Sequence, residues 1–164
     1  ARAAGMELQH VKAHGILYDM MEKDPALARA AADAVAESGD GNLILVTLAA
    51  SNAERCAREL GLRVAAEGFA DRAYNPDGTL VSRRRPGALI TDPELAAAQA
   101  VRMATQGKVR SIDGADIDLT VQTICCHGDT PGAPRIVRAV REGLEHAHCR
   151  VRAMRQLECF SAVS

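Results

Sequence analysis

The sequence predicts an α/β protein with a mostly parallel sheet that is covered by helices on at least one face. Short apolar segments of strand length alternate with segments that carry helix-capping residues. The segments between strands are long enough for the right-handed crossovers that join parallel strands. Ionisable side chains follow several strands, where α/β proteins place their chemistry. The 164 residues predict a single domain over residues 1–164, which can bury about two thirds of its unfolded surface.

The predicted strands and helices follow one another along the whole chain. Four apolar runs are predicted as strands of the sheet, at residues 6–12, 43–48, 62–66 and 123–126. Four helices are predicted between and after them, at residues 24–38, 51–60, 91–106 and 134–146. Three of these helices begin with capping signals, which are Asp24 before Pro25, Ser51 with Glu54, and Thr91 with Glu94. Asp129 or Thr130 is predicted to cap the last helix.

Three further segments complete the predicted architecture. Residues 109–119, with Asp113 and Gly114 at their centre, predict a small hairpin, and the segment from Val151 onward predicts a last short strand. The polar segment 71–87 contains a turn signal and three consecutive arginines, and loops of this length tend to be functional. We therefore expect about five strands, with residues 6–12 at an open edge that favours self-association.

The composition excludes several classes of function. The chain has no Trp, two Tyr and two Phe, so a nucleic-acid platform of stacked aromatic rings is not expected. Its formal net charge of -1, from 20 basic and 21 acidic residues, provides no field that attracts nucleic acid or an anionic membrane. No apolar run reaches the roughly 18 residues of a membrane span, and the amino end lacks an apolar signal segment. We expect a cytoplasmic protein.

The five cysteines have the spacing of neither a metal site nor a disulfide framework, which indicates reduced thiols. Cys125 and Cys126 are adjacent on a predicted strand, so their side chains point to opposite faces. A buried packing role is favoured over a catalytic thiol, because free cysteines are commonly buried.

Residues 123–132, with the sequence TICCHGDTPG, place two ionisable side chains where a predicted strand ends. Gly128 lets the backbone turn after His127, and Asp129 follows at once. An imidazole and a carboxylate at this position are suited to act as general base and acid, and the helix start is suited to hold an anion. A structural histidine beside a helix cap is equally compatible with this motif alone.

A second polar stretch, HVKAHG at residues 10–15, extends along the first predicted strand. His10, Lys12 and His14 share one face if the strand continues through all three. Four strand steps separate the two histidines by about 13 Å, so a shared metal ion is not expected. Lys12 is suited to bind an anion or, if desolvated, to act as a base.

A third polar group follows residues 62–66. Glu67 and Asp71 are carboxylates, and Arg72 and Arg83 can pair with them or with the carboxylate of a substrate. Residue types alone favour structural salt bridges here.

Taken together, these stretches resemble the LamB/YcsF family, which comprises the A subunits of 5-oxoprolinase. The similar blocks, in the family's order and spacing, are HVKAHGILY at residues 10–18, EGFADRAY at 67–74 with Asp77, Gly78 and Arg83, PGALI at 86–90, and CHGD at 126–129. The resemblance implies an incomplete, distorted β/α barrel, similar to that of the polysaccharide deacetylases, with helices outside the sheet. Ala13 stands where the family motif has proline. The family's opening acidic block is not found, so the resemblance covers roughly the carboxyl-terminal two thirds of its domain.

The resemblance also implies an activity and its participants. It implies ATP-dependent opening of the lactam of 5-oxo-L-proline to L-glutamate, with Mg²⁺ accompanying ATP and with partner subunits B and C. The catalytic residues that it implies are Lys12, His14, Asp71, His127 and Asp129. The substrate-binding residues that it implies are His10, Glu67, Arg72 and Arg83. Because the carboxyl ends of parallel strands open on one rim, Lys12, Asp71 and His127 are expected to converge on one cleft.

Two alternatives stay open from the sequence. One is a metal-dependent amide or carbohydrate deacetylase-like hydrolase, with His10, His14 and His127 near one rim. The other is a noncatalytic fragment that acts as an assembly surface.

Overall fold

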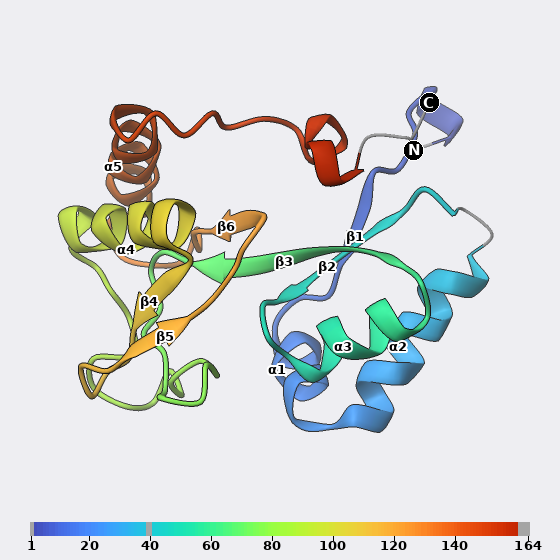
Figure 1. Cartoon of the computed structure of the whole chain (residues 1–164), viewed down its shortest axis with the longest axis horizontal. Helices are drawn as coiled ribbons and strands as arrows, with labels where there is room; N and C mark the ends of the chain where they lie inside the picture. Colours follow the sequence, from blue (N-terminus) through green and yellow to red (C-terminus); the bar gives the residue numbers. More distant parts are fainter. Residues whose placement is uncertain (1, 39–40, 161–164) are drawn as a thin grey trace. The chain divides into compact units, whose positions relative to one another are not determined.

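The computed structural model describes residues 2–38 and 41–160 and divides the chain into two compact units (Figure 1). The first unit comprises Ala1–Ala66 and Arg152–Ser164, and the second comprises Glu67–Val151. In the described residues, the main sheet has the strand order β1-β2-β3-β6, and a separate two-stranded sheet contains β4 and β5. The predicted sheet of about five strands therefore has four, and β1 lies at its edge as expected.

The first unit packs three helices against parallel strands. Strand β1 (His10–Lys12) pairs with β2 (Ile44–Leu48), and β3 (Arg63–Phe69) begins in this unit. The helices are α1 (Ile16–Lys23), α2 (Pro25–Glu37) and α3 (Asn52–Glu59), and a 3₁₀ turn, η1 (Arg2–Ala4), precedes them. Small and branched side chains of α2, α3 and the strands form one apolar core, which includes Ala32, Val35, Leu45, Ala57 and Val64. The predicted alternation of strands and helices along the chain is confirmed in this unit.

The predicted caps of α2 and α3 are confirmed. The Asp24 carboxylate accepts hydrogen bonds from the backbone N–H groups of Ala26 and Leu27, and the Ser51 hydroxyl accepts one from the N–H of Glu54. Helix α4 differs from the prediction, because Asp92 caps it and the predicted capping residue Thr91 does not. The Asp92 carboxylate stands directly before Pro93 and accepts from two N–H groups of the first turn, as an N-cap does.

The segment from Val151 onward does not form the predicted strand within its described residues, which end at Phe160. It forms two 3₁₀ turns, η2 (Met154–Gln156) and η3 (Glu158–Phe160). Met154, Leu157 and Phe160 pack together against Ile44, Val46 and Ala65 of the sheet. Their spacing of three residues matches the period of a 3₁₀ helix, which places them on one face, and the alternation of a strand would separate them.

The second unit pairs the end of β3 with β6 (Thr123–Cys125) and covers them with two long helices. Glu67 lies opposite Thr123 and Phe69 opposite Cys125, in parallel register. Helices α4 (Pro93–Gln106) and α5 (Ala133–His146) pack closely, through a core that includes Ala96, Ala100, Ile136, Val140 and Leu144. The contact is so close at Gly143 that an added Cβ would lie 3.3 Å from Val101 Cγ2. Alanine and glycine therefore bring these two helices together.

The predicted hairpin and the long polar segment also belong to the second unit. Strands β4 (Lys108–Arg110) and β5 (Asp116–Asp118) are antiparallel, with the turn at Asp113 and Gly114. The segment 71–87 is compact, because its own Ala73 and Val81 pack against Ala88, which follows it. It therefore supplies a fixed support for the polar residues that it carries.

Helix α5 begins at Ala133, within one residue of its predicted start, but its cap differs from the prediction. Its N-cap is Gly132, in a left-handed conformation with φ of 81°, and no side chain caps it. Asp129 and Thr130 therefore do not act as caps, because their side chains bind other partners that belong to the candidate site.

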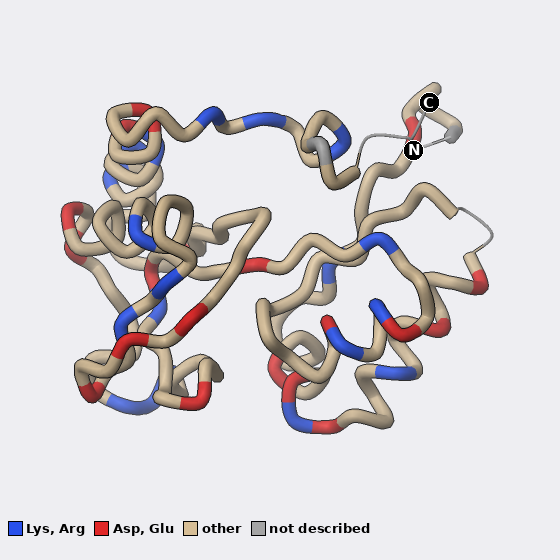
Figure 2. Tube along the Cα trace, in the orientation of Figure 1, with Lys and Arg blue, Asp and Glu red and all other residues tan. Residues whose placement is uncertain are grey.

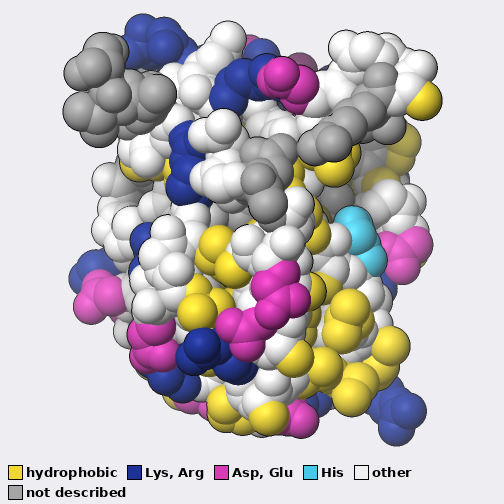
Figure 3. Space-filling view, turned by 90° about the vertical axis from the view of Figure 1, so that its right-hand side faces the viewer, with side chains coloured by type: hydrophobic (Ala, Val, Ile, Leu, Met, Phe, Trp, Pro, Cys, Tyr) yellow, Lys and Arg dark blue, Asp and Glu magenta, His cyan; other side chains and the backbone are white. Residues whose placement is uncertain are grey.

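Acidic and basic residues are interspersed within each unit (Figure 2). In the first unit, several large apolar side chains are exposed, namely Met6, Leu8, Ile16, Leu17 and Met20. Figure 3 shows a face on which hydrophobic side chains reach the surface beside charged ones. Within the described ranges, no helix is both long and apolar enough to cross a lipid bilayer.

Candidate active site

The candidate site is built around Asp71, just beyond the end of β3. The backbone here is held on both sides, because the N–H of Ala70 donates to the carbonyl of Cys125 and the N–H of Ile90 donates to the carbonyl of Asp71. The Asp71 side chain is 0% exposed. A carboxylate at such a place must find hydrogen-bond donors, because burying an unpaired charge is costly.

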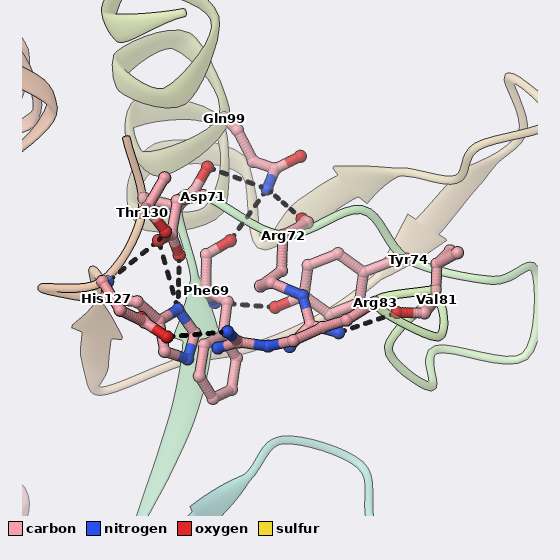
Figure 4. A network of polar contacts seen from close by, with 11 residues as sticks. Phe69, Asp71, Arg72, Tyr74, Val81, Arg83, Gln99, His127 and Thr130 are labelled. Carbon is pink, nitrogen blue, oxygen red and sulfur yellow. Dashed lines mark hydrogen bonds and ion pairs between the residues drawn. The ribbon is translucent and has the colours of Figure 1, made fainter. Parts of the chain in front are cut away.

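His127 and Thr130 provide these donors (Figure 4). The backbone N–H of His127 donates to Asp71 Oδ2 at 2.9 Å, and the Thr130 hydroxyl donates to the same oxygen at 2.7 Å. The imidazole Nδ1 of His127 lies 2.9 Å from Asp71 Oδ1. Burial by itself raises the pKa of Asp71, but the hydrogen bonds from His127 and Thr130 outweigh it and lower the pKa to about 2. Asp71 is therefore ionised at neutral pH.

The ionised carboxylate orients the imidazole of His127. Because the ionised Asp71 can only accept, the neutral form of the ring carries its proton on Nδ1 and has Nε2 as its acceptor. The ring stacks on Phe69, with centroids 5.3 Å apart and an angle of 14° between the planes. The His127 side chain is 21% exposed, so the pair combines a buried carboxylate with a reachable imidazole. Such a pair is suited to remove a proton from water or from a bound hydroxyl group.

The depressed pKa of Asp71 predicts a loss of stability in acid. The carboxylate stabilises the folded state above its unfolded pKa of 3.8, and this contribution is lost as the pH falls towards the folded pKa of about 2. The shift corresponds to about 2 kcal/mol of unfolding free energy. We expect the parent to lose this amount between about pH 4 and about pH 2, and Asp71→Asn to lack this part of the pH dependence. Urea denaturation across this range measures it, and identical pH profiles would contradict the assignment.

Arg83 and Asp129 form an ion pair at the exposed side of the site. Arg83 Nη1 lies 3.0 Å from Asp129 Oδ2, and the two side chains are 43% and 71% exposed. The hydrogen bond from Arg83 lowers the pKa of Asp129. In Figure 4, Arg83 extends from its loop towards His127. Arg83 therefore does not pair with Glu67 or Asp71 as the sequence suggests.

Arg72 and Glu67 are buried beside the site. Arg72 Nη2 donates to the carbonyl of Val81 at 2.7 Å, which ties the polar loop to the end of β3. The hydroxyl of buried Tyr74 accepts a hydrogen bond from the N–H of Phe69 at 2.7 Å. The substrate-binding roles that the sequence predicts for Glu67 and Arg72 stay predictions.

The residues of the HVKAHG stretch lie in the first unit. Strand β1 ends at Lys12, so His14 lies beyond it and the three side chains do not continue along one strand face as expected. The Lys12 ammonium lies 5.8 Å from the centre of the Tyr18 ring. His10 and His14 are exposed. Convergence of Lys12 with Asp71 and His127 stays a prediction.

The cysteines are free thiols, and Cys126 packs against the core between α4 and α5. Burial, followed by the nearby Asp71 carboxylate, raises the pKa of Cys126 to about 11. The thiol is therefore protonated at neutral pH, as a packing role requires. In the part of the chain that the structure describes, no group of three His, Cys, Asp or Glu side chains could hold a metal ion, and we assign no metal ligands.

Two members of the site were not predicted in their actual roles. Thr130 lies in the quoted TICCHGDTPG motif, but its hydroxyl serves Asp71, 59 residues away in the sequence. Gln99 of α4 binds the backbone on both sides of Asp71. Its sequence signal is a polar residue among Ala96, Ala100 and Met103, which are spaced along the buried face of α4.

The fold and the site define a class of protein, which is a parallel α/β protein with a carboxylate–histidine pair at the carboxyl ends of two neighbouring strands. The chain belongs to the LamB/YcsF family, whose profile matches residues 1–159. It is 52% identical over 153 residues to the 5-oxoprolinase A subunit of Pyrococcus furiosus, a match that covers 93% of this chain and 60% of that protein. It is 50% identical over 153 residues to the corresponding 5-oxoprolinase protein of Alkaliphilus metalliredigens, with 93% and 59% covered.

A solved structure agrees with this assignment. The crystal structure of the lactam utilization protein from Thermus thermophilus superimposes with a TM-score of 0.84 at 47% identity, over 93% of this chain and 60% of that chain. The fold is thus an incomplete, distorted α/β barrel, as the resemblance implies. The chain spans about 60% of the length of the relatives named here.

Proposed function

We propose that this chain acts as part of the A subunit of an ATP-dependent 5-oxoprolinase, which opens the lactam of 5-oxo-L-proline to give L-glutamate. The names of its relatives support this substrate. The observation that carries the proposal is the Asp71–His127 pair, which presents an oriented imidazole within a chain about half identical to these proteins. The relatives' names do not favour the deacetylase or the noncatalytic alternative.

A lactam resists direct hydrolysis, so the proposed reaction first activates it with ATP and then lets water attack. Transfer of the γ-phosphoryl group of MgATP to the lactam carbonyl oxygen would release ADP and make the carbonyl carbon more electrophilic. Water then attacks that carbon, the C–N bond opens, and a second water releases phosphate, so that glutamate, ADP and phosphate are formed. In this scheme His127 Nε2 accepts the proton of the attacking water, and the Asp71 carboxylate stabilises the resulting imidazolium.

The remaining candidate residues are assigned either to the substrate or to the phosphoryl group. Arg83 is assigned to the substrate carboxylate, with His10, Glu67 and Arg72 as further substrate-binding candidates. Lys12 and His14 are assigned to the anionic phosphoryl group, for which Lys12 supplies a positive charge. Asp129 is kept ionised by Arg83, which suits a base or an electrostatic role and does not suit an acid. Subunits B and C and a cytoplasmic location belong to the same proposal.

The direct test is an assay of the assembled enzyme. With 5-oxoproline and MgATP, we expect glutamate and ADP to form in equal amounts, and we expect neither product to form at that rate when 5-oxoproline or ATP is omitted. Glutamate formed without ATP would overturn the ATP-dependent scheme. An assembly with all partners that forms no glutamate would overturn the proposed function.

The role of Arg83 is tested against its neighbour. We expect Arg83→Gln to raise the KM for 5-oxoproline at least about 10-fold with a smaller change in kcat, because a charge-assisted contact to the substrate carboxylate is lost. Arg84→Gln removes the same charge from the adjacent, exposed position and serves as the matched control. Equal KM values for the two variants would contradict the assignment.

A further inference from the structure

Gln99 reaches from α4 to the backbone that carries Asp71 (Figure 4). Its Nε2 lies 2.8 Å from the carbonyl oxygen of Phe69 and 2.8 Å from that of Arg72, with the carbonyl of Ala70 at 3.3 Å. A carboxamide nitrogen has two hydrogens, so it can donate to both of the closer oxygens. These two carbonyls stand on either side of Asp71. Gln99 therefore spans the turn in which Asp71 lies.

This turn is the point at which the site leaves regular structure. Strand β3 ends at Phe69, and its pairing with β6 ends with the bond from the N–H of Ala70 to the carbonyl of Cys125. Buried carbonyl groups beyond a strand need donors from elsewhere. Phe69, Ala70 and Arg72 are all buried, and Gln99 is a donor common to their carbonyls.

The turn must hold its shape for the Asp71–His127 pair to form. Asp71 Oδ2 accepts from both the His127 backbone and Thr130, and its carboxylate also meets the imidazole Nδ1. These donors come from the segment after β6, so a rotation of the turn moves the carboxylate away from all of them together. A displacement of about 1 Å is enough to reduce catalysis strongly.

We propose that Gln99 is a positioning residue, which holds the backbone on both sides of Asp71 so that the carboxylate keeps the His127 imidazole in its Nδ1–H form. Gln99 is not assigned any contact with substrate. Its catalytic consequence rests on the proposed function, whereas its effect on His127 does not.

The test replaces the carboxamide without emptying its space. Gln99→Met fills a similar volume and donates no hydrogen bond, and Gln106→Met makes the same change at the exposed end of α4 as a control. The first readout is the ¹⁵N spectrum of the His127 ring in the full chain, which distinguishes the two neutral tautomers. We expect the parent and Gln106→Met to show the Nδ1–H form, and Gln99→Met to show a large share of the Nε2–H form.

The second readout is kinetic. In the assembled enzyme, we expect Gln99→Met to lower kcat about 10-fold, with KM for 5-oxoproline within about twofold of the parent, because geometry and not binding is lost. A purely structural role would lower the amount of folded protein and leave the tautomer and kcat of the folded fraction unchanged. Unchanged tautomer and kcat in Gln99→Met would therefore overturn the proposal.

A second variant covers the case in which Gln99→Met does not fold. Gln99→Glu keeps the shape of the side chain but, once ionised, cannot donate to the carbonyls. If it folds with the parental tautomer, the carboxamide of Gln99 does not position Asp71, and the proposal is wrong. If neither variant folds, Gln99 is required for folding, and the proposal is wrong as well. If Gln99→Met alters the tautomer while even the parental assembly does not turn over 5-oxoproline, the positioning role is supported and the proposed function is overturned. The two proposals can therefore be told apart.

Discussion

His127→Ala is expected to lower the kcat for 5-oxoproline-dependent glutamate formation by at least about 100-fold, because a positioned general base contributes this much or more. When the imidazole is removed, Asp71 keeps the hydrogen bonds from the backbone N–H of residue 127 and from the Thr130 hydroxyl, so the carboxylate can remain in place. Steady-state assays of the assembled enzyme measure the effect. His146→Ala is the matched control, because His146 is an exposed histidine of α5 whose Nδ1 contacts a carbonyl of the same helix.

The pair should also behave as one unit. If Asp71 acts by orienting and charging His127, Asp71→Asn should reduce kcat strongly, and the double variant should be no worse than His127→Ala alone. Because Asp71 also stabilises the fold, the reduced kcat must be distinguished from a loss of folded protein. Thermal unfolding of each variant measures the folded fraction. A His127→Ala enzyme with more than about a tenth of parental kcat would rule out the general-base assignment.

Lys12→Ala is expected to lower turnover by at least about 100-fold, because it removes a positive charge proposed to stabilise the phosphoryl group during transfer. Lys23→Ala removes an equivalent charge from an exposed position at the end of α1 and should have little effect. The comparison is made at saturating ATP and 5-oxoproline, so that a change in kcat is separated from a change in binding.

Cys126→Ala is the informative companion to Lys12→Ala. Cys126 packs against the core between α4 and α5, and its raised pKa keeps the thiol protonated, so we expect nearly parental turnover and only a small loss of stability. An inactive Cys126→Ala enzyme, together with a fully active Lys12→Ala enzyme, would replace the imidazole and ammonium assignments with a thiol nucleophile.

Several features of this protein could be predicted from local sequence because they depend on neighbouring residues. Asp24 and Ser51 cap helices through N–H groups two or three residues away, and Gly107 ends α4 in a left-handed conformation. The apolar runs that became β2 and β6 were recognised because a buried parallel strand needs a short continuous apolar segment. The motif at residues 123–132 also placed His127 at a strand end.

The partners of the site residues depend on the tertiary structure. Asp71 and His127 are 56 residues apart in the sequence, and only the parallel pairing of β3 with β6 brings their segments together. Once Asp71 was buried, its carboxylate required donors, and it bound the Thr130 hydroxyl that local sequence assigned to a helix cap. Arg83, which residue types alone would pair with Glu67 or Asp71, instead binds the exposed Asp129.

Local propensity and periodicity were therefore enough to set the order of strands β1 to β6 and helices α2 to α5, the caps of α2 and α3, and the residue types available for chemistry. Long-range packing was needed to select the carboxylate that holds His127, the hydroxyl that supports it, and Gln99 as the residue that binds the turn between β3 and the polar loop. The two levels differ because a buried polar group accepts whichever donor the packing brings within about 3 Å, and packing depends on residues far apart in the chain.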